Sequence, residues 1–286
     1  AWLGGALVAA TFGVILGAAI VGIRDTEFDD LQGIIPAVAS SSCAGNEVGE
    51  ASTNDGGVAD PNEFSLEATL SCGELEVVRA SGATWSLEAQ HDEGDAPVVE
   101  TTGDSVATQG LELSQGGSED FGLLGWQVQS LWDVQLPAEA ALRMNTTLNA
   151  AKGKYDAGEG PVARVSGTFN ASDARIDLGS ATTPSPASVG LTLNASDGSL
   201  SLPLGVITGG ITLNASSLDL CVPRDAELRI DYTSVLGSDD LGSSGLEEVS
   251  SGLWTADGSV EADARVSLSI TNTVSSLSIE RPESCS

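Results

Sequence analysis

Few residues in this chain could perform chemistry, and they stand apart from one another. The single histidine, His91, lies in the polar run 90–95, so any Ser-His-Asp triad would have to use it. The sequence contains no Gly-x-Ser-x-Gly elbow, no His-Glu-x-x-His zinc motif and no P-loop. We therefore interpret His91 as a surface-loop histidine, and we predict a chain that is not an enzyme and needs no cofactor.

Carboxylates are abundant and could supply the oxygen ligands that Ca²⁺ prefers. The chain has 41 acidic and 11 basic residues, which give a formal net charge of −30. Acidic pairs such as Asp239-Asp240 and Glu247-Glu248 lack the spacing of an EF-hand or a calcium-binding nonapeptide repeat. We interpret them as solvated surface and predict no metal site. The same charge would repel nucleic acid, which we exclude as a partner.

Four cysteines, without Cys-x-x-Cys spacing, could form two disulfides. Of the three pairings we predict Cys43–Cys72 and Cys221–Cys285, each of which would tie a terminal segment to the body of the protein. Disulfides persist in oxidising compartments, so these pairings would place the body outside the cytoplasm. The alternative is four buried free thiols in a cytosolic domain.

A five-residue motif, Thr-Leu/Phe-Asn-Ala-Ser/Ala, recurs four times. The copies begin at Thr147, Thr168, Thr192 and Thr212, so their starts are 21, 24 and 20 residues apart. A period of roughly 20–25 residues is typical of stacked β-coils, because each coil buries its apolar face only against a neighbour. Each copy contains an asparagine before two small residues. We expect this asparagine at the corner between strands, where it would tolerate the left-handed backbone conformation.

The asparagines of the motif also spell glycosylation sequons at Asn170, Asn194 and Asn214, and Asn145 begins a fourth. Either the turn motif coincides with the acceptor sequence, or these side chains carry glycans on an exported surface. The copy Asn149-Ala150-Ala151 keeps the motif without being a sequon, so we favour the structural interpretation.

The N-terminal segment predicts a membrane anchor. No charged residue occurs in residues 1–23, and this length of helix at about 1.5 Å per residue spans the ~30 Å hydrocarbon layer. A secretory signal peptide is the alternative, but no basic segment precedes the apolar run and no clear cleavage site ends it. Gly13 and Gly17 have the spacing of a helix-packing motif.

Beyond the anchor the pattern changes twice. Residues 26–62 are acidic and rich in Gly and Ser, which predicts a tether. From Phe64 onward apolar and polar residues alternate in short runs separated by turn residues. We therefore predict a transmembrane helix at 1–25, the tether at 26–62, an all-β solenoid domain at 63–282 and a tail at 283–286.

Aromatic residues outside this alternation are candidates for contact with other molecules. Phe121, Trp126 and Trp132 cluster in one apolar stretch, and Trp254 lies in a second predicted loop. These side chains would either cap the ends of the β core or form a docking patch, for which tryptophan is favoured.

Several short motifs occur in an order known from one family. They are Leu70-Ser71-Cys72-Gly73-Glu74-Leu75-Glu76-Val77, Trp132-Asp133-Val134-Gln135-Leu136-Pro137, and Val222-Pro223 followed by Leu228-Arg229-Ile230. With them, the segment from Phe64 to Glu280 resembles the toast-rack β-solenoid domain of LiaF-type, cell-wall-active antibiotic response proteins and related adhesin domains. The chain departs from that family by using Asn-Ala-Ser where Gly-Ala-Gly is usual. The resemblance implies a rigid extracytoplasmic module for sensing, adhesion or assembly, without catalytic residues.

These observations predict a non-catalytic, membrane-anchored accessory or scaffold subunit. Residues 1–25 would pack in the lipid bilayer within a larger integral membrane protein complex, and the β domain would lie on its periplasmic or extracellular face. One alternative is a LiaF-like envelope-stress sensor or regulator. Another is a glycosylated cell-surface adhesin or envelope subunit.

Overall fold

The computed structural model describes residues 50–57, 61–81, 84–91, 96–103, 107–116, 130–183, 186–258 and 264–285. All of them belong to one compact unit, residues 38–286. Every regular element in these ranges is a strand, so they hold no helix that could cross a membrane. The expected all-β class is confirmed. The predicted anchor at 1–25, with Gly13 and Gly17, lies outside the described residues.

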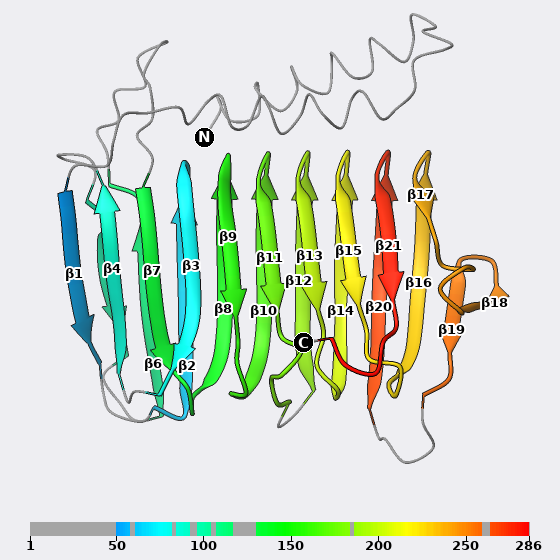
Figure 1. Cartoon of the computed structure of the whole chain (residues 1–286), viewed down its shortest axis with the longest axis horizontal. Coiled ribbons are helices and arrows are strands. Elements are labelled where there is room, and N and C mark those ends of the chain that lie inside the picture. The colour runs from blue at the N-terminus through cyan, green and yellow to red at the C-terminus, as the bar shows by residue number, and fades with distance from the viewer. Residues whose placement is uncertain are drawn as a thin grey trace, which may run out of the picture. The chain divides into compact units, whose positions relative to one another are not determined.

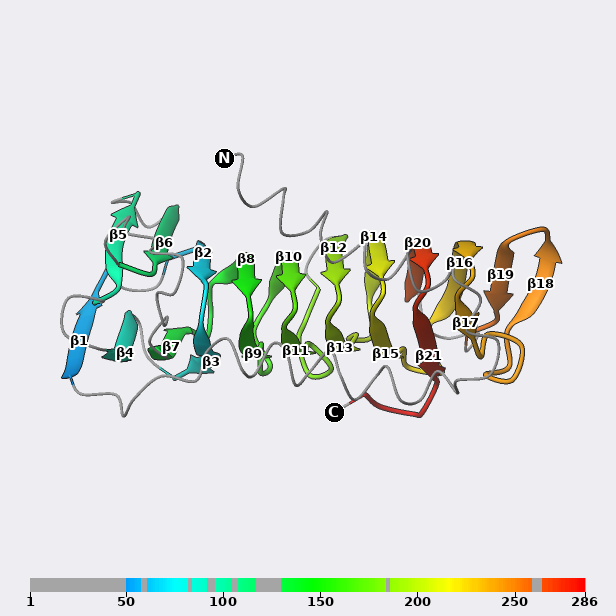
Figure 2. The same cartoon turned by 90° about the horizontal axis from the view of Figure 1, so that it is seen from above.

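The strands of the described residues form two sheets that face each other (Figures 1 and 2). Sheet A contains, in spatial order, β1 (Glu50–Gly56), β4 (Trp85–His91), β7 (Ser130–Pro137), β3 (Gly73–Ala80), β9 (Ala151–Asp156), β11 (Asp173–Asp177), β13 (Asp197–Ser201), β15 (Ser217–Cys221), β21 (Ser276–Glu280) and β17 (Ser238–Asp239). Sheet B contains β18 (Glu247–Ser250), β19 (Leu253–Ala256), β16 (Glu227–Val235), β20 (Arg265–Thr273), β14 (Val206–Asn214), β12 (Ala187–Asn194), β10 (Val162–Asn170), β8 (Ala141–Asn149), β2 (Glu63–Leu70), β6 (Thr108–Ser114) and β5 (Val98–Thr102).

The centre of the molecule is a stack of coils, each of which gives one strand to each sheet. Consecutive coils, such as β10–β11 and β12–β13, pair in parallel within both sheets. The threonines that begin the repeated motif are direct partners, since Thr168 pairs with both Thr147 and Thr192. The four copies of the motif therefore occupy the same place in four successive coils, which is the arrangement of a β-solenoid.

Alternate residues of each strand point into the space between the sheets and form one continuous core. The central row of this core consists of Leu148, Phe169, Leu193 and Leu213, which are at most 1% exposed. Burying a side chain of this size stabilises the fold by about 1.5–3 kcal/mol. Since each of these side chains packs between neighbouring coils, the core belongs to the stack and not to any single coil.

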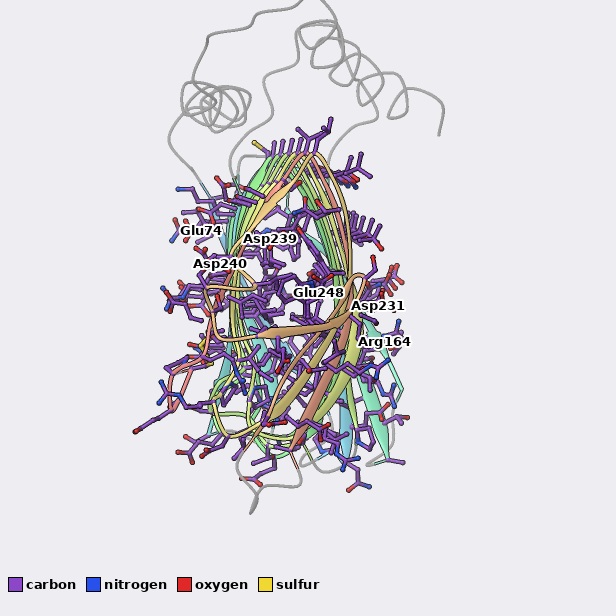
Figure 3. The ribbon with its side chains drawn as sticks, turned by 90° about the vertical axis from the view of Figure 1, so that its right-hand side faces the viewer. Glu74, Arg164, Asp231, Asp239, Asp240 and Glu248 are labelled. Carbon is purple, nitrogen blue, oxygen red and sulfur yellow. A yellow bond between two sulfur atoms is a disulfide. The ribbon has the colours of Figure 1, made fainter. Side chains whose placement is uncertain are left out.

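A narrow corner joins the two strands of each central coil (Figure 3). The alanine of the motif, and not the asparagine, adopts the left-handed conformation, with φ of 53°, 49°, 50° and 51° at Ala150, Ala171, Ala195 and Ala215. The expectation that asparagine takes this conformation is therefore wrong. The asparagine instead ends its strand, where its side chain is free to bond to the next coil.

Asn149, Asn170, Asn194 and Asn214 form an asparagine ladder along this corner. The side-chain Nδ2 atoms of the last three donate to Oδ1 of the preceding asparagine at 2.8, 2.8 and 2.9 Å. The serines that follow form a second series, in which Ser196 Oγ accepts the backbone N–H of Ser172 at 3.1 Å. Both series fix the register of one coil on the next, because a slip by one residue would break them together.

Near each end of the stack, one coil lies out of chain order. The coil β2–β3 sits between β6–β7 and β8–β9, and the coil β20–β21 sits between β14–β15 and β16–β17. The connection from β7 to β8 must therefore cross β2–β3, and the connection from β15 to β16 must cross β20–β21. The chain order alone does not predict these two crossings.

An arginine from the crossed coil holds each crossing connection. At the end of β3, Arg79 Nη2 donates to the carbonyl oxygens of Ala138 and Ala140. Directly after β21, Arg281 Nη2 donates to the carbonyl oxygens of Arg224 and Ala226, at 2.9 and 2.6 Å. The two arginines have the same role because each connection begins with the same Pro-x-x-Ala sequence, at residues 137–140 and 223–226.

Two further features bear on the predicted domain limits. Strand β1 (Glu50–Gly56) pairs with β4, so part of the segment predicted to be a tether belongs to the β structure. The predicted disulfide Cys221–Cys285 is confirmed, with a Cα–Cα distance of 5.7 Å. Cys72 is also disulfide-bonded, whereas Cys43, its predicted partner, lies outside the described residues.

Candidate binding surface

The histidine is not a surface-loop residue as predicted. His91 ends β4, is 3% exposed, and lies with Nε2 3.2 Å from Ser52 Oγ on β1. The pair brings a hydroxyl and an imidazole together, but the imidazole is buried between two paired strands. We therefore regard His91 as part of the packing that joins β1 to the stack.

Of the aromatic candidates, Trp132 is a core residue and not a docking residue. Its side chain is 2% exposed because it occupies an inward position of β7. Trp254 is not in a loop, since it lies on β19, where it is half-buried and packs against the core. Phe121 and Trp126 lie outside the described residues. Trp132 is therefore not part of an aromatic docking patch.

The sequon asparagines fall into two structural classes. Asn170, Asn194 and Asn214 belong to the asparagine ladder, so the nitrogen that would carry a glycan already donates a hydrogen bond to the neighbouring coil. Asn145 instead projects from the outer face of β8, where Nδ2 lies 3.5 Å from Glu67 Oε1. Asn145 is thus the most accessible acceptor of the four.

Charged side chains face one another across neighbouring strands on the outer face of sheet A. Asp133 on β7 is paired in register with Glu76 on β3 and Glu88 on β4, and the next strand adds Lys154, which forms an ion pair with Glu76. Partial burial, and then Glu76 and Glu88, raise the pKa of Asp133. No group of three or more possible metal ligands forms among the described residues.

The outer face of sheet B differs, because its central strands carry small uncharged residues. The row on β10, β12, β14 and β20 consists of Ser166, Gly190, Gly210 and Ser269. The row beside it is a continuous line of threonines on seven neighbouring strands, namely Thr69, Thr147, Thr168, Thr192, Thr212, Thr271 and Thr233. A protein of this charge thus keeps a polar but neutral strip on one face.

A hollow opens on sheet B beside the end of this strip, with a volume of about 410 Å³. We call it the arginine hollow, after Arg143 on β8 and Arg164 on β10. It is lined by residues of five strands, namely Ser65, Leu66, Glu67, Thr102, Leu111, Glu112, Arg143, Met144, Asn145, Arg164 and Ser166. Figure 3 shows Arg164 on the outer side of this sheet.

Charges of both signs meet in the arginine hollow. Arg143 and Arg164 are direct partners in the pairing of β8 with β10. Arg143 Nε binds Glu63 Oε1 at 2.8 Å, whereas Arg164 is exposed and forms no ion pair with any residue that the structure describes. Glu67 and Glu112 are likewise direct partners across β2 and β6. The hollow therefore presents a pair of cations beside a pair of carboxylates.

The polar groups between these charges are already oriented. Ser166 Oγ donates to the backbone oxygen of Met144 at 3.1 Å and also lies 3.2 Å from Asn145 Oδ1. Ser65 Oγ lies 3.4 Å from the backbone oxygen of Gln109. These contacts hold the hydroxyl and amide groups in place without a ligand, which lowers the entropic cost of binding one.

The sequence alone does not mark these residues as a site. Arg143, Arg164, Glu67 and Glu112 come from four strands and share no motif in the sequence. The repeats offered one signal, because the aligned copies starting at Thr147 and Thr168 place Arg143 and Arg164 each four residues before the motif. Residues at equal offsets in successive coils become neighbours on the sheet.

Comparison with known proteins relates this chain to proteins of similar fold. No protein-family model and no curated protein matches it. Among solved structures, a "putative cell adhesion protein" from Clostridium sporogenes is similar, with a TM-score of 0.52 and 12% identity over 81% of this chain and all of that one. A "putative adhesin" from Bacteroides fragilis matches at a TM-score of 0.31 and 9% identity, over 80% of this chain and 97% of that one. The first of these likenesses shows that the chain shares its fold with a solved all-β protein.

Proposed function

We propose that this chain is a non-catalytic binding module of the cell envelope that acts as an adhesin through the outer faces of its β stack. The observation that carries the proposal is the separation of apolar and polar residues between the inside and the outside of the stack. The inward positions form one continuous apolar core, and the outward positions form long regular rows of polar side chains. A rigid surface that repeats from coil to coil suits contact with an extended partner.

Two findings support a location outside the cytoplasm. The Cys221–Cys285 disulfide is of a kind that persists in oxidising compartments. The solved structure with a similar fold is named for cell adhesion. Membrane attachment through residues 1–25 completes this proposal, with the lipid bilayer as the first partner.

The accessory-subunit role remains a second candidate. In that role the anchor and one β face would dock on an integral membrane protein complex. The exposed Val235 and Leu236, at 57% and 87%, favour some protein contact at the corner of the last coil. Leu236 has a φ of 59°, an unusual conformation for a bulky residue.

Retention under flow tests the adhesin proposal. The full chain is displayed on a bacterial host that does not adhere, and cells are washed over surfaces coated with purified wall polysaccharide, mucin or serum albumin. A chain that ends at residue 49 serves as the matched control. We expect the full chain alone to increase retention, on the polysaccharide or mucin coat and not on albumin.

Equal retention of both chains on every coat would contradict the adhesin proposal. Extraction in mild detergent then separates the other candidates. Stoichiometric recovery with one membrane complex would support the accessory subunit, and recovery only with a signalling kinase would support the LiaF-like regulator.

A further inference from the structure

The geometry of the arginine hollow points to a ligand class: we infer that it binds the carboxylate of an acidic saccharide. The inference deepens the proposed function and rests on it. It concerns one site on sheet B, formed where β2, β6, β8 and β10 lie side by side with β5 at the rim.

The cation pair favours an anionic ligand. Arg143 and Arg164 face each other on adjacent strands, an arrangement in which like charges repel and weaken the sheet. Arg143 engages Glu63 through Nε, one of its five N–H donors. Arg164 forms no ion pair among the described residues, so its guanidinium group is available to a ligand. A bound carboxylate would balance it, because the planar guanidinium fork matches a carboxylate with two parallel hydrogen bonds.

The carboxylate pair of the hollow discriminates among acidic ligands. Glu67 and Glu112 line the same hollow and would repel a peptide that carries several acidic side chains. Carboxylate oxygens are strong acceptors for hydroxyl groups, and Asn145 and Ser166 add further polar partners. A ligand with one carboxylate and several hydroxyls satisfies both halves of the hollow. An acidic sugar has that composition.

The surroundings of the hollow allow the ligand to continue as a chain. Its volume of about 410 Å³ lies within the roughly 300–1,000 Å³ of small-molecule sites. From Ser166 the neutral strip runs on through Gly190 and Gly210, which carry no side chain that could block a sugar ring. The regular spacing of these strands, about 4.8 Å, offers equivalent contacts to successive units of a polysaccharide.

Titration of the purified full chain in mild detergent tests the inference. The probes are galacturonate, sialyllactose and N-acetylneuraminic acid, each with one carboxylate, and binding is measured by calorimetry and saturation-transfer NMR. The methyl ester of galacturonate is the neutral control, and a hexapeptide of Asp and Gly is the competing acidic ligand. Arg164→Gln is the test variant. Arg229→Gln is its matched control, because Arg229 is also exposed on sheet B, on β16, and its substitution removes the same charge away from the hollow.

We expect at least one acidic saccharide to bind and its Kd to rise roughly tenfold or more in Arg164→Gln, since a charge-assisted contact is lost. In Arg229→Gln the Kd should stay within about twofold, and the methyl ester should not bind. Failure of all three saccharides to bind, or equal effects of the two variants, would overturn the inference. Tighter binding of the hexapeptide would also overturn it and make the hollow a peptide site. If the displayed chain still increases retention under flow, these failures concern the hollow alone and leave the proposed function standing.

Discussion

The asparagine ladder makes a quantitative prediction about stability. Asn194 donates to Asn170 and accepts from Asn214, so Asn194→Ala removes two side-chain hydrogen bonds. A neutral hydrogen bond contributes a net of about 0.5–1.5 kcal/mol, which gives about 1–3 kcal/mol for the two. Asn194 is only half-buried, so water replaces part of what is lost. We therefore expect the free energy of unfolding to fall by about 1–2 kcal/mol.

Asn194→Asp adds a pH dependence of known sign. The carboxylate can still accept from Asn214, but it can no longer donate to Asn170 Oδ1, and two oxygens then face each other. This raises the pKa of the new carboxyl in the folded state above its value in the unfolded chain. The folded state then binds the proton more readily, so the variant regains stability as the pH falls through roughly 4.

The assay is urea unfolding of the full chain in mild detergent with its disulfides intact, followed by the fluorescence of the buried tryptophans Trp85 and Trp132. Asn145→Ala is the control, because Asn145 is exposed and its two side-chain contacts, 3.5 Å to Glu67 Oε1 and 3.2 Å to Ser166 Oγ, lie at the surface outside the asparagine ladder. Two results would refute the ladder as a stabilising element. One is a decrease in the free energy of unfolding below about 0.5 kcal/mol in Asn194→Ala. The other is an Asn194→Asp variant whose stability relative to the wild type does not change with pH.

Three further predictions follow from the same structure. Ala195→Gly should raise the free energy of unfolding by up to about 1 kcal/mol, since φ is 50° there, whereas Ala141→Gly, in ordinary strand geometry, should lower it; urea unfolding compares the two. Cys221→Ser should lower the free energy of unfolding by about 2–5 kcal/mol, because it opens a link across 64 residues; a reductant should lower that of the wild type by at least as much, since it also opens the disulfide of Cys72, and a wild type that keeps its full stability after reduction would contradict this. Asp133→Asn should stabilise the protein at neutral pH by roughly 0.2–1 kcal/mol by removing one of three facing carboxylates; because the pKa of Asp133 is raised in the folded state, the advantage should fade as the pH falls through the carboxyl range, and thermal melts from about pH 3 to 8 would show it.

Most of the fold that can be predicted from the sequence follows from the repeated motif and from the alternation of apolar and polar residues. The four copies gave the coil period, and the alternation from Phe64 gave the strands and their buried faces. The same alternation runs through Trp132, Val134 and Leu136, which are all buried. This alternation favours the core over the docking patch for Trp132, and the buried side chain agrees with it.

The two displaced coils could not be predicted in the same way. Strand periodicity shows which face is buried, but it does not show which strand lies next to which. Pairing of β3 with β7 and β9, which sets the crossing near Arg79, depends on packing between distant segments. The arginine hollow has the same origin, since Glu67 and Asn145 become neighbours only after β2 inserts beside β8. The candidate site is therefore a product of the inserted coil.

The displaced coil at the C-terminal end, β20–β21, also determines how late in synthesis the fold can be completed. Strand β16 joins the rest of sheet B only through β20, which is made later by the ribosome. A growing chain therefore cannot add its coils in the order of synthesis, and β16 must wait for residues 264–280 before it has a place. Premature termination would leave a gap inside the stack instead of a shorter stack. An incomplete copy would therefore expose an unpaired, aggregation-prone sheet edge to the chaperones and proteases of the cell.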